Sequence, residues 1–213
     1  MEKLDQPAST GNRILGDGCR TMRAAALKLA NRGLHVFPCA PRGKIPVTAH
    51  GCLDATADAE QIRTWWSKHP DANIGIATGS KSGIWVLDID GENGEAALRA
   101  LEKRMQPLPT TVESITGGGG RHLFFKLPDF KDAPVIRNSA KQLGAGLDVR
   151  GEGGYVVAPP SVHPSGRPYC WSVDTAPGFA DPPVWLIALI TLPQTGVTNL
   201  DERRSPDHWK RIA

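Results

Sequence analysis

The sequence predicts a mixed α/β (α+β) fold with a largely antiparallel sheet and a small N-terminal α/β portion. From residue 73 onward, apolar residues fall into short alternating runs, which are typical of strands. Most links between these runs are too short for the helical crossovers that parallel strands require. Ahead of them, two helical patterns enclose one short apolar run. Strands therefore dominate the second half of the chain and helices the first.

The N-terminal portion combines helix and strand signals. Residues 22–31 favour a helix, which Gly33 can end in the left-handed conformation. A short strand is expected over residues 35–37. A capping pattern at Asp58 opens a second helix, which should end near Pro70.

The apolar runs that follow are bounded by glycines, and each predicts one or two strands. Two further helices are expected, over residues 95–104 and 184–190. The runs predicted to form strands cover residues 73–79, 83–91, 110–127 and 144–161.

Composition restricts the possible classes of protein. The 213 residues suit one domain or two small ones, and 40% of them are apolar, so wholesale disorder is excluded. A net charge of +3 permits a nucleic-acid partner but does not require one. The four cysteines form no C-x-x-C pair, so we expect neither a zinc site nor a disulfide framework.

The domain boundaries are predicted from composition. Residues 1–18 are polar and glycine-rich and are expected to form a disordered leader. Residues 19–192 should form the domain, and the charged residues 193–213 a linker toward a missing C-terminal region. Neither a signal peptide nor a membrane span is visible, so we expect a cytoplasmic protein without a membrane partner.

Two aspartates share one face of a predicted strand. Alternation over residues 85–91 places Asp88 and Asp90 on the same side, opposite the apolar residues. Like charges at this spacing repel one another unless divalent cations bridge them. A solvent-facing strand end followed by a glycine turn is the simpler alternative for an isolated pair.

A glycine run and a third aspartate follow in the sequence. The run Gly117 to Gly120 exposes backbone amides and leads into Arg121 and His122, a layout that suits phosphate. It does not match the P-loop pattern, and a flexible glycine hairpin is an alternative. Asp148 lies on an apolar strand between glycines, where a turn-capping role is also possible.

Together these residues suggest a site for two divalent metal ions. Three carboxylates can hold two Mg²⁺ or Mn²⁺ ions, and the glycine-framed histidine can hold an anionic group beside them. Such a site clamps the attacking and leaving oxygens of an in-line phosphoryl displacement. Nucleotidyl transfer is the reaction that fits.

Three ordered motifs resemble the archaeo-eukaryotic primase superfamily, and specifically the bifunctional DNA primase/polymerase domain of plasmid, phage and prophage replication proteins. The similarity extends over roughly residues 22–190, including the RGKIP loop at 42–46 and the SVHPSG turn at 161–166. The motifs are VLDIDG at 86–91, GGRHLFF at 119–125 and GLDVRGEGGYVVAPPS at 146–161.

The resemblance implies a primase-like catalytic core that acts as a nucleotidyltransferase, a DNA primase or DNA-directed DNA polymerase. Its partners would be a single-stranded DNA template, an NTP or dNTP, and a helicase or accessory domain C-terminal to this segment. Asp88, Asp90 and Asp148 would be the metal ligands, and His122 would contact the phosphates of the nucleotide. The remaining residues expected at the nucleotide are Lys44, Gly118, Gly119, Gly120 and Arg121.

The sequence departs from the family at one position. The second motif often has serine two residues before its histidine, where this chain has Gly120, so a hydroxyl contact is missing there. Some relatives carry a zinc-binding insertion, against which the scattered cysteines argue.

Two alternative hypotheses of function remain open. One is a catalytically silent nucleic-acid-binding replication initiator module. The other is a mononuclear iron enzyme that uses His122, Asp148 and His163. The iron enzyme leaves Asp88 and Asp90 unexplained, and metal-dependent nucleotide incorporation would separate all three readings.

Overall fold

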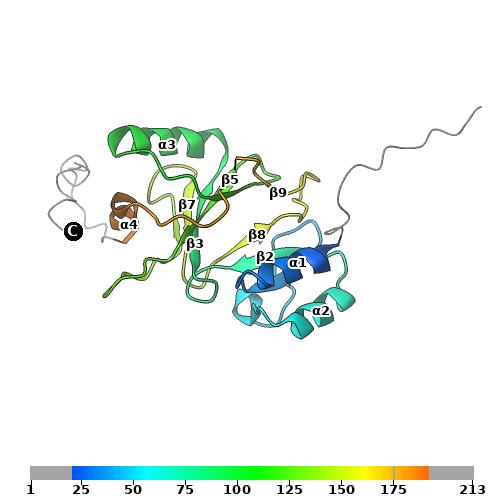
Figure 1. The fold of residues 1–213 in the computed structure, drawn as a ribbon. Coiled ribbons are helices and arrows are strands. Elements are labelled where there is room, and N and C mark those ends of the chain that lie inside the picture. The colour runs from blue at the N-terminus through cyan, green and yellow to red at the C-terminus, as the bar shows by residue number, and fades with distance from the viewer. Residues whose placement is uncertain (1–20, 175, 192–213) are drawn as a thin grey trace, which may run out of the picture.

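A computed structural model describes residues 21–174 and 176–191 of the chain. Within these residues the fold has four α-helices and two antiparallel sheets, as expected for an α+β protein (Figure 1). The predicted leader 1–18 and linker 193–213 lie outside the described residues. No helix in the described part of the chain is both long and apolar enough to span a membrane.

The smaller sheet has three strands in the order β1-β2-β8, and its first two strands come from the N-terminal portion. Helices α1 and α2 pack against each other beside it (Figure 1). Thr21 caps α1 by accepting from the Ala24 amide, and Asp58 caps α2 by accepting from the Glu60 amide. The elements of this part are α1 (Met22–Ala30), β1 (Val36–Cys39), the 3-10 helix η1 (Gly51–Asp54), α2 (Ala59–Lys68), β2 (Asn73–Ala77) and β8 (Tyr155–Ala158).

The larger sheet has six strands in the order β6-β7-β3-β5-β4-β9, with β3 and β5 near its centre. Helices α3 and α4 belong to the same part of the fold as this sheet (Figure 1). The elements are β3 (Ile84–Ile89), α3 (Gly91–Arg104), β4 (Val112–Ile115), β5 (Arg121–Lys126), β6 (Ser139–Ala140), β7 (Leu147–Arg150), β9 (Cys170–Trp171) and α4 (Val184–Thr191).

One face of the six-stranded sheet forms a buried core. Every second residue of β3 is fully buried there among side chains of α3 and α4. Burial contributes about 25 cal/mol per Å² of apolar surface, so this core stabilises the packing of α3 and α4 on the sheet. The residues of β3 in this core are Trp85, Leu87 and Ile89. The opposite face is partly buried as well, where Ile84, Val86 and Phe124 share a second core with α1, α2 and the three-stranded sheet.

The structure differs from the sequence prediction in two respects. The run 144–161 was expected within one sheet, but β7 belongs to the six-stranded sheet and β8 to the three-stranded sheet. The glycine-rich link 151–154 carries the chain from one sheet to the other. The third helix begins at Gly91 rather than at residue 95, and it includes Gly94, which fits closely against the Gly146 carbonyl.

Candidate active site

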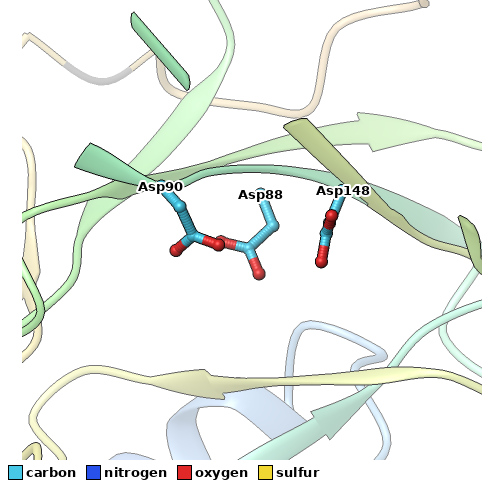
Figure 2. A group of neighbouring side chains, drawn as sticks. All are labelled: Asp88, Asp90 and Asp148. Atoms are coloured by element: carbon cyan, nitrogen blue, oxygen red, sulfur yellow. The ribbon is translucent and has the colours of Figure 1, made fainter. Parts of the chain in front are cut away.

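Three aspartates converge on the face of the six-stranded sheet that is turned away from α3 and α4, toward the three-stranded sheet. Asp88 on β3 is the register partner of Asp148 on β7, and Asp90 follows β3 by one residue. One carboxylate oxygen from each residue lies within 4.8 Å of the others. Figure 2 shows all three carboxylates on the same side of the sheet, with those of Asp88 and Asp90 directed toward one another.

The Asp90 carboxylate does not cap the helix that follows it. Asp90 occupies the N-cap position of α3, but its side chain makes no capping hydrogen bond. Its amide donates to the Gly146 carbonyl at 2.8 Å, which joins the end of β3 to the start of β7. Gly91 has a φ of +55° and turns the chain into the helix. The carboxylate therefore lies beside Asp88 and is exposed.

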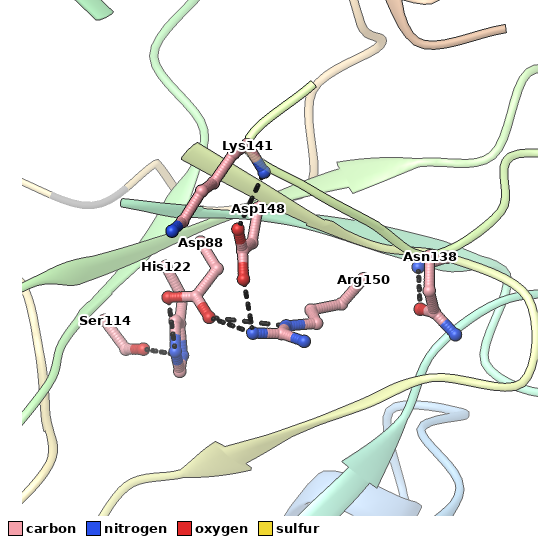
Figure 3. Close-up of polar contacts among 8 residues, drawn as sticks. Asp88, Ser114, His122, Asn138, Lys141, Asp148 and Arg150 are labelled. Atoms are coloured by element: carbon pink, nitrogen blue, oxygen red, sulfur yellow. Dashed lines mark hydrogen bonds and ion pairs between the residues drawn. The ribbon is translucent and has the colours of Figure 1, made fainter. Parts of the chain in front are cut away.

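Arg150 bridges two of the three aspartates. Its Nη2 donates to Asp88 Oδ2 at 3.1 Å and to Asp148 Oδ2 at 3.0 Å (Figure 3). The sequence reasoning did not identify this residue. Alternation along the strand could have predicted its place, because Arg150 is two positions after Asp148 on β7 and so shares its face.

His122 lies beside Asp88 on the neighbouring strand. The two residues are register partners, and His122 Nε2 is 3.4 Å from Asp88 Oδ1. On the other side of the ring, Nδ1 is 3.4 Å from the hydroxyl oxygen of Ser114, the register partner of His122 on β4 (Figure 3). A hydroxyl thus reaches His122 from β4, although position 120 is glycine. Ser114 was not identified from the sequence, because strand pairing is needed to bring it there.

The first two aspartates have pKa values shifted in opposite directions. Burial raises the pKa of Asp88, but the hydrogen bond and charge of His122, together with Arg150, outweigh it and lower the pKa overall. Burial raises the pKa of Asp90, and the negative charges of Asp88 and Asp148 raise it further, against Lys44 and Arg150. The cations therefore favour the charged form of Asp88, whereas burial and the neighbouring carboxylates disfavour that of Asp90.

Tyr169 packs against the histidine of the site. It is 2% exposed, and its ring centroid lies 6.2 Å from that of His122 and 6.0 Å from that of His163. Burial, followed by the charge of Asp88, raises the pKa of Tyr169 to about 12. The phenol therefore stays protonated at neutral pH.

The glycine turn before β5 is held by its own hydrogen bonds. The amide of Gly119 donates to the Thr116 carbonyl at 3.1 Å, and that of Gly120 to the Thr116 hydroxyl at 3.0 Å. A Cβ on Gly120 would collide with the Ile89 carbonyl. These contacts give the glycines a packing role, and a nucleotide contact by Gly118, Gly119 and Gly120 stays a prediction.

A second turn supports the glycine turn. The Gly117 carbonyl accepts hydrogen bonds from the Ser165 hydroxyl and from Arg167 Nε, both at 2.9 Å. His163 Nδ1 lies 3.0 Å from the Ser165 hydroxyl oxygen. Burial and the charges of Lys44 and Arg167 lower the pKa of His163. The SVHPSG segment therefore fixes the glycine turn in place.

The structure does not bring Arg121 to the aspartates. Alternation along β5 directs it to the opposite face from His122, where its guanidinium binds Glu95 of α3 at 2.6 and 3.1 Å. Glu113 lies 3.5 Å from the same guanidinium. Arg121 therefore has carboxylate partners away from the site, and its predicted role at the nucleotide lacks support.

Lys44 is exposed on the loop after β1, close enough for its charge to lower the pKa of Asp90. Its carbonyl accepts a hydrogen bond from the Tyr155 hydroxyl at 3.0 Å, which ties the loop to β8. The smaller part of the fold thus contributes a cation to the region of the aspartates.

The donor set fits a hard divalent cation. Three carboxylates supply oxygen ligands, which Mg²⁺ and Mn²⁺ prefer to nitrogen or sulfur. Among the described residues, the candidate metal cluster contains these aspartates and neither His122 nor His163, so the iron-enzyme reading has no geometric basis. The cluster could therefore bind divalent metals.

A comparison with protein-family models decides the family. The model described as "Bifunctional DNA primase/polymerase, N-terminal" matches residues 26–185, which is well over half of the chain. The chain belongs to this prim-pol family. The match includes all four residues of the site, Asp88, Asp90, His122 and Asp148, and confirms the resemblance drawn from the three motifs. The comparison with curated proteins gave no match.

Proposed function

We propose that this prim-pol domain catalyses template-directed nucleotidyl transfer, as a DNA primase, a DNA polymerase or both, by a two-metal mechanism. Family membership supports the general class, primase/polymerase-type nucleotidyl transfer. The observation that carries the mechanism is the cluster of three carboxylates within 4.8 Å of one another on one face of the sheet.

The aspartates are the proposed ligands of the ions. When bound, two divalent ions would activate the attacking 3′-hydroxyl and neutralise the triphosphate and its departing pyrophosphate. Asp88 and Asp148 are fixed by the pairing of β3 with β7, and Asp90 by the hydrogen bond that its amide donates to the Gly146 carbonyl. Placement on paired strands holds the carboxylates in position before substrate binds, which is how such sites lower a barrier.

His122 and Lys44 are the proposed contacts of the nucleotide phosphates. His122 lies on the strand next to the aspartates, and an imidazole N–H can donate to a phosphate oxygen. Lys44 provides a positive charge from the other part of the fold. The glycines of residues 118–120 are the remaining proposed contacts, although the amides of Gly119 and Gly120 donate within the turn.

The biological setting belongs to the same proposal. The substrates are a single-stranded DNA template and an NTP or dNTP, and the expected partner is a helicase or accessory domain C-terminal to this segment. Replication of a plasmid, phage or prophage-type element is the setting in which such domains are expected.

Template-directed synthesis tests the proposal. Incorporation is measured with and without a primer, with Mg²⁺ or Mn²⁺, and with NTPs or dNTPs. Asp88→Ala and Asp90→Ala should abolish incorporation while circular dichroism stays normal. Glu95→Gln is the matched control, because it removes a carboxylate from the opposite face of the same sheet. Near-wild-type incorporation by both aspartate variants contradicts the assignment, and no incorporation by wild type favours a silent initiator module.

A further inference from the structure

One row of register partners crosses the six-stranded sheet from the aspartates to its far edge. Asp88 pairs with His122, His122 with Ser114, and Ser114 with Trp171 on β9. Register partners on neighbouring antiparallel strands point to the same face. At about 4.8 Å between strands, Trp171 lies about 14 Å from Asp88 along this row. Its side chain therefore shares the face of the proposed active site.

A cavity of about 820 Å³ opens beside this tryptophan. Its volume lies in the range of about 300–1,000 Å³ that small-molecule sites occupy. Trp171 lines it together with Phe124, whose ring centroid is 5.7 Å away, and with Phe179. The opposite wall comes from α1, so the cavity lies between the two parts of the fold. Trp171 is 38% exposed, although Phe124 beside it is fully buried.

The charged residues of the cavity are both cations. Lys28 and Arg32 line it from α1 and the residues after it, and both are exposed. No acidic residue is among those that line it, and in the described part of the chain neither cation forms an ion pair. An aromatic wall facing two uncompensated cations is complementary to a ligand with flat bases and negative phosphates.

We propose that this cavity binds an unpaired base of single-stranded nucleic acid, with Trp171 as the stacking surface and Lys28 and Arg32 as phosphate contacts. The inference rests on the proposed function, since it assigns a place to the template strand outside the metal and nucleotide site. Stacking on an aromatic ring tolerates any base, so the contact holds template without reading its sequence.

Binding of a fluorescein-labelled oligothymidylate to the full chain tests the proposal. Fluorescence anisotropy is recorded without metal or nucleotide, so that the readout is independent of catalysis. Trp171→Ala should weaken binding about five- to hundredfold, the range for base stacking on one aromatic side chain, and Trp171→Phe should restore much of it. Lys28→Ala with Arg32→Ala should weaken binding and reduce the salt dependence by roughly one unit of slope for each lost contact.

Two controls separate this inference from the proposed catalysis. Lys103→Ala removes an exposed cation on α3, away from the cavity, and should leave oligothymidylate affinity unchanged. Asp88→Ala should bind oligothymidylate as wild type does even though it is inactive. A strongly lowered melting temperature would show that Trp171→Ala destabilises the fold. In that case the proposal is tested with the double variant of Lys28 and Arg32, because both side chains are exposed.

Two results would overturn the proposal. The first is wild-type affinity and salt dependence in both the Trp171 and the double variant. The second is displacement of the labelled oligothymidylate from the cavity by micromolar thymidine monophosphate, which would make the cavity a mononucleotide site.

Discussion

The two faces of the six-stranded sheet differ in how their charged side chains are paired. Arg121 and His122 are neighbours in the chain, yet they lie on opposite faces. On the face toward α3 and α4, Arg121 makes a two-pronged ion pair with Glu95, and Glu113 lies nearby. On the face toward the three-stranded sheet, Arg150 donates to two of the three aspartates, with Lys44 at the edge. Both faces carry acids beside an arginine, but among the described residues only the second face gathers three carboxylates at metal-binding distance.

This difference between the two faces explains why carboxylates alone do not identify a metal site. An acid beside its own arginine stabilises the fold modestly, whereas a cluster held together by the backbone against its own repulsion is typical of a ligand site. The raised pKa of Asp90, caused by burial and then by Asp88 and Asp148, reflects this repulsion.

The largest effect on stability is expected on the face of β3 toward α3 and α4. Leu87 is fully buried there, in the core shared with these two helices. Leu87→Ala should cost about 2–5 kcal/mol, because the cavity that it leaves cannot be filled. Urea unfolding measures the loss. A cost below 1 kcal/mol would mean that Leu87 is not closely packed in this core.

His122→Ala should act on the nucleotide and spare the metal ions. Loss of one charge-assisted hydrogen bond to phosphate is worth roughly 1.5–3 kcal/mol, or about 10- to 150-fold in nucleotide affinity. The thermal shift produced by Mn²⁺ should survive. Nucleotide titration and a Mn²⁺ thermal shift on the same variant check both expectations. A variant that loses the metal shift but keeps nucleotide affinity would make His122 a metal ligand.

Arg150→Ala should expose the repulsion among the aspartates. Without its guanidinium, Asp88 and Asp148 lose their shared cation, and the metal-free protein should lose about 1–2 kcal/mol. The side chain is 36% exposed, so solvent screening keeps the loss below that of a buried pair. Bound Mn²⁺ should compensate, so the Mn²⁺-induced rise in melting temperature is expected to exceed that of wild type. An equal rise would show that Arg150 does not neutralise the cluster.

The smallest effect is a gain in stability from Asp90→Asn. This change removes a carboxylate that its neighbours repel, so the metal-free melting temperature at pH 7 should rise by about 1–2 °C while incorporation is lost. A raised native pKa means that the wild type loses stability as the pH rises through that pKa. The gain should therefore disappear only as the pH falls well below about 3.9, the ordinary pKa of an aspartate, where the carboxyl is protonated in both states. A fall in melting temperature at pH 7 would refute the repulsion.

Much of the site could be predicted from alternation along single strands. Period two placed Asp88 and Asp90 on one face, and the same rule, applied to β5 and β7, would have excluded Arg121 and included Arg150. Ser114 could not be found this way, since its place beside His122 depends on the pairing of β4 with β5.

The fold class and the positions of the helices followed from local patterns, but sheet membership did not. The predicted run 144–161 divides between two sheets, because β8 pairs with β2 through contacts some 80 residues apart in the chain. No local period encodes such a choice. The start of α3 was placed too late because Gly91 and Gly94 disfavour helix, whereas a close contact with Gly146 requires a residue without a side chain at position 94.

The most direct test of the central claim is the Mn²⁺ thermal shift of wild type beside Asp148→Asn. A ligand at a hundredfold excess over its dissociation constant stabilises the native state by about 2.7 kcal/mol, which corresponds to a rise of roughly 5–10 °C for a chain of this size. We predict such a rise for wild type at millimolar Mn²⁺ and a much smaller one for Asp148→Asn. An unchanged melting temperature in wild type would contradict a metal site at the three aspartates.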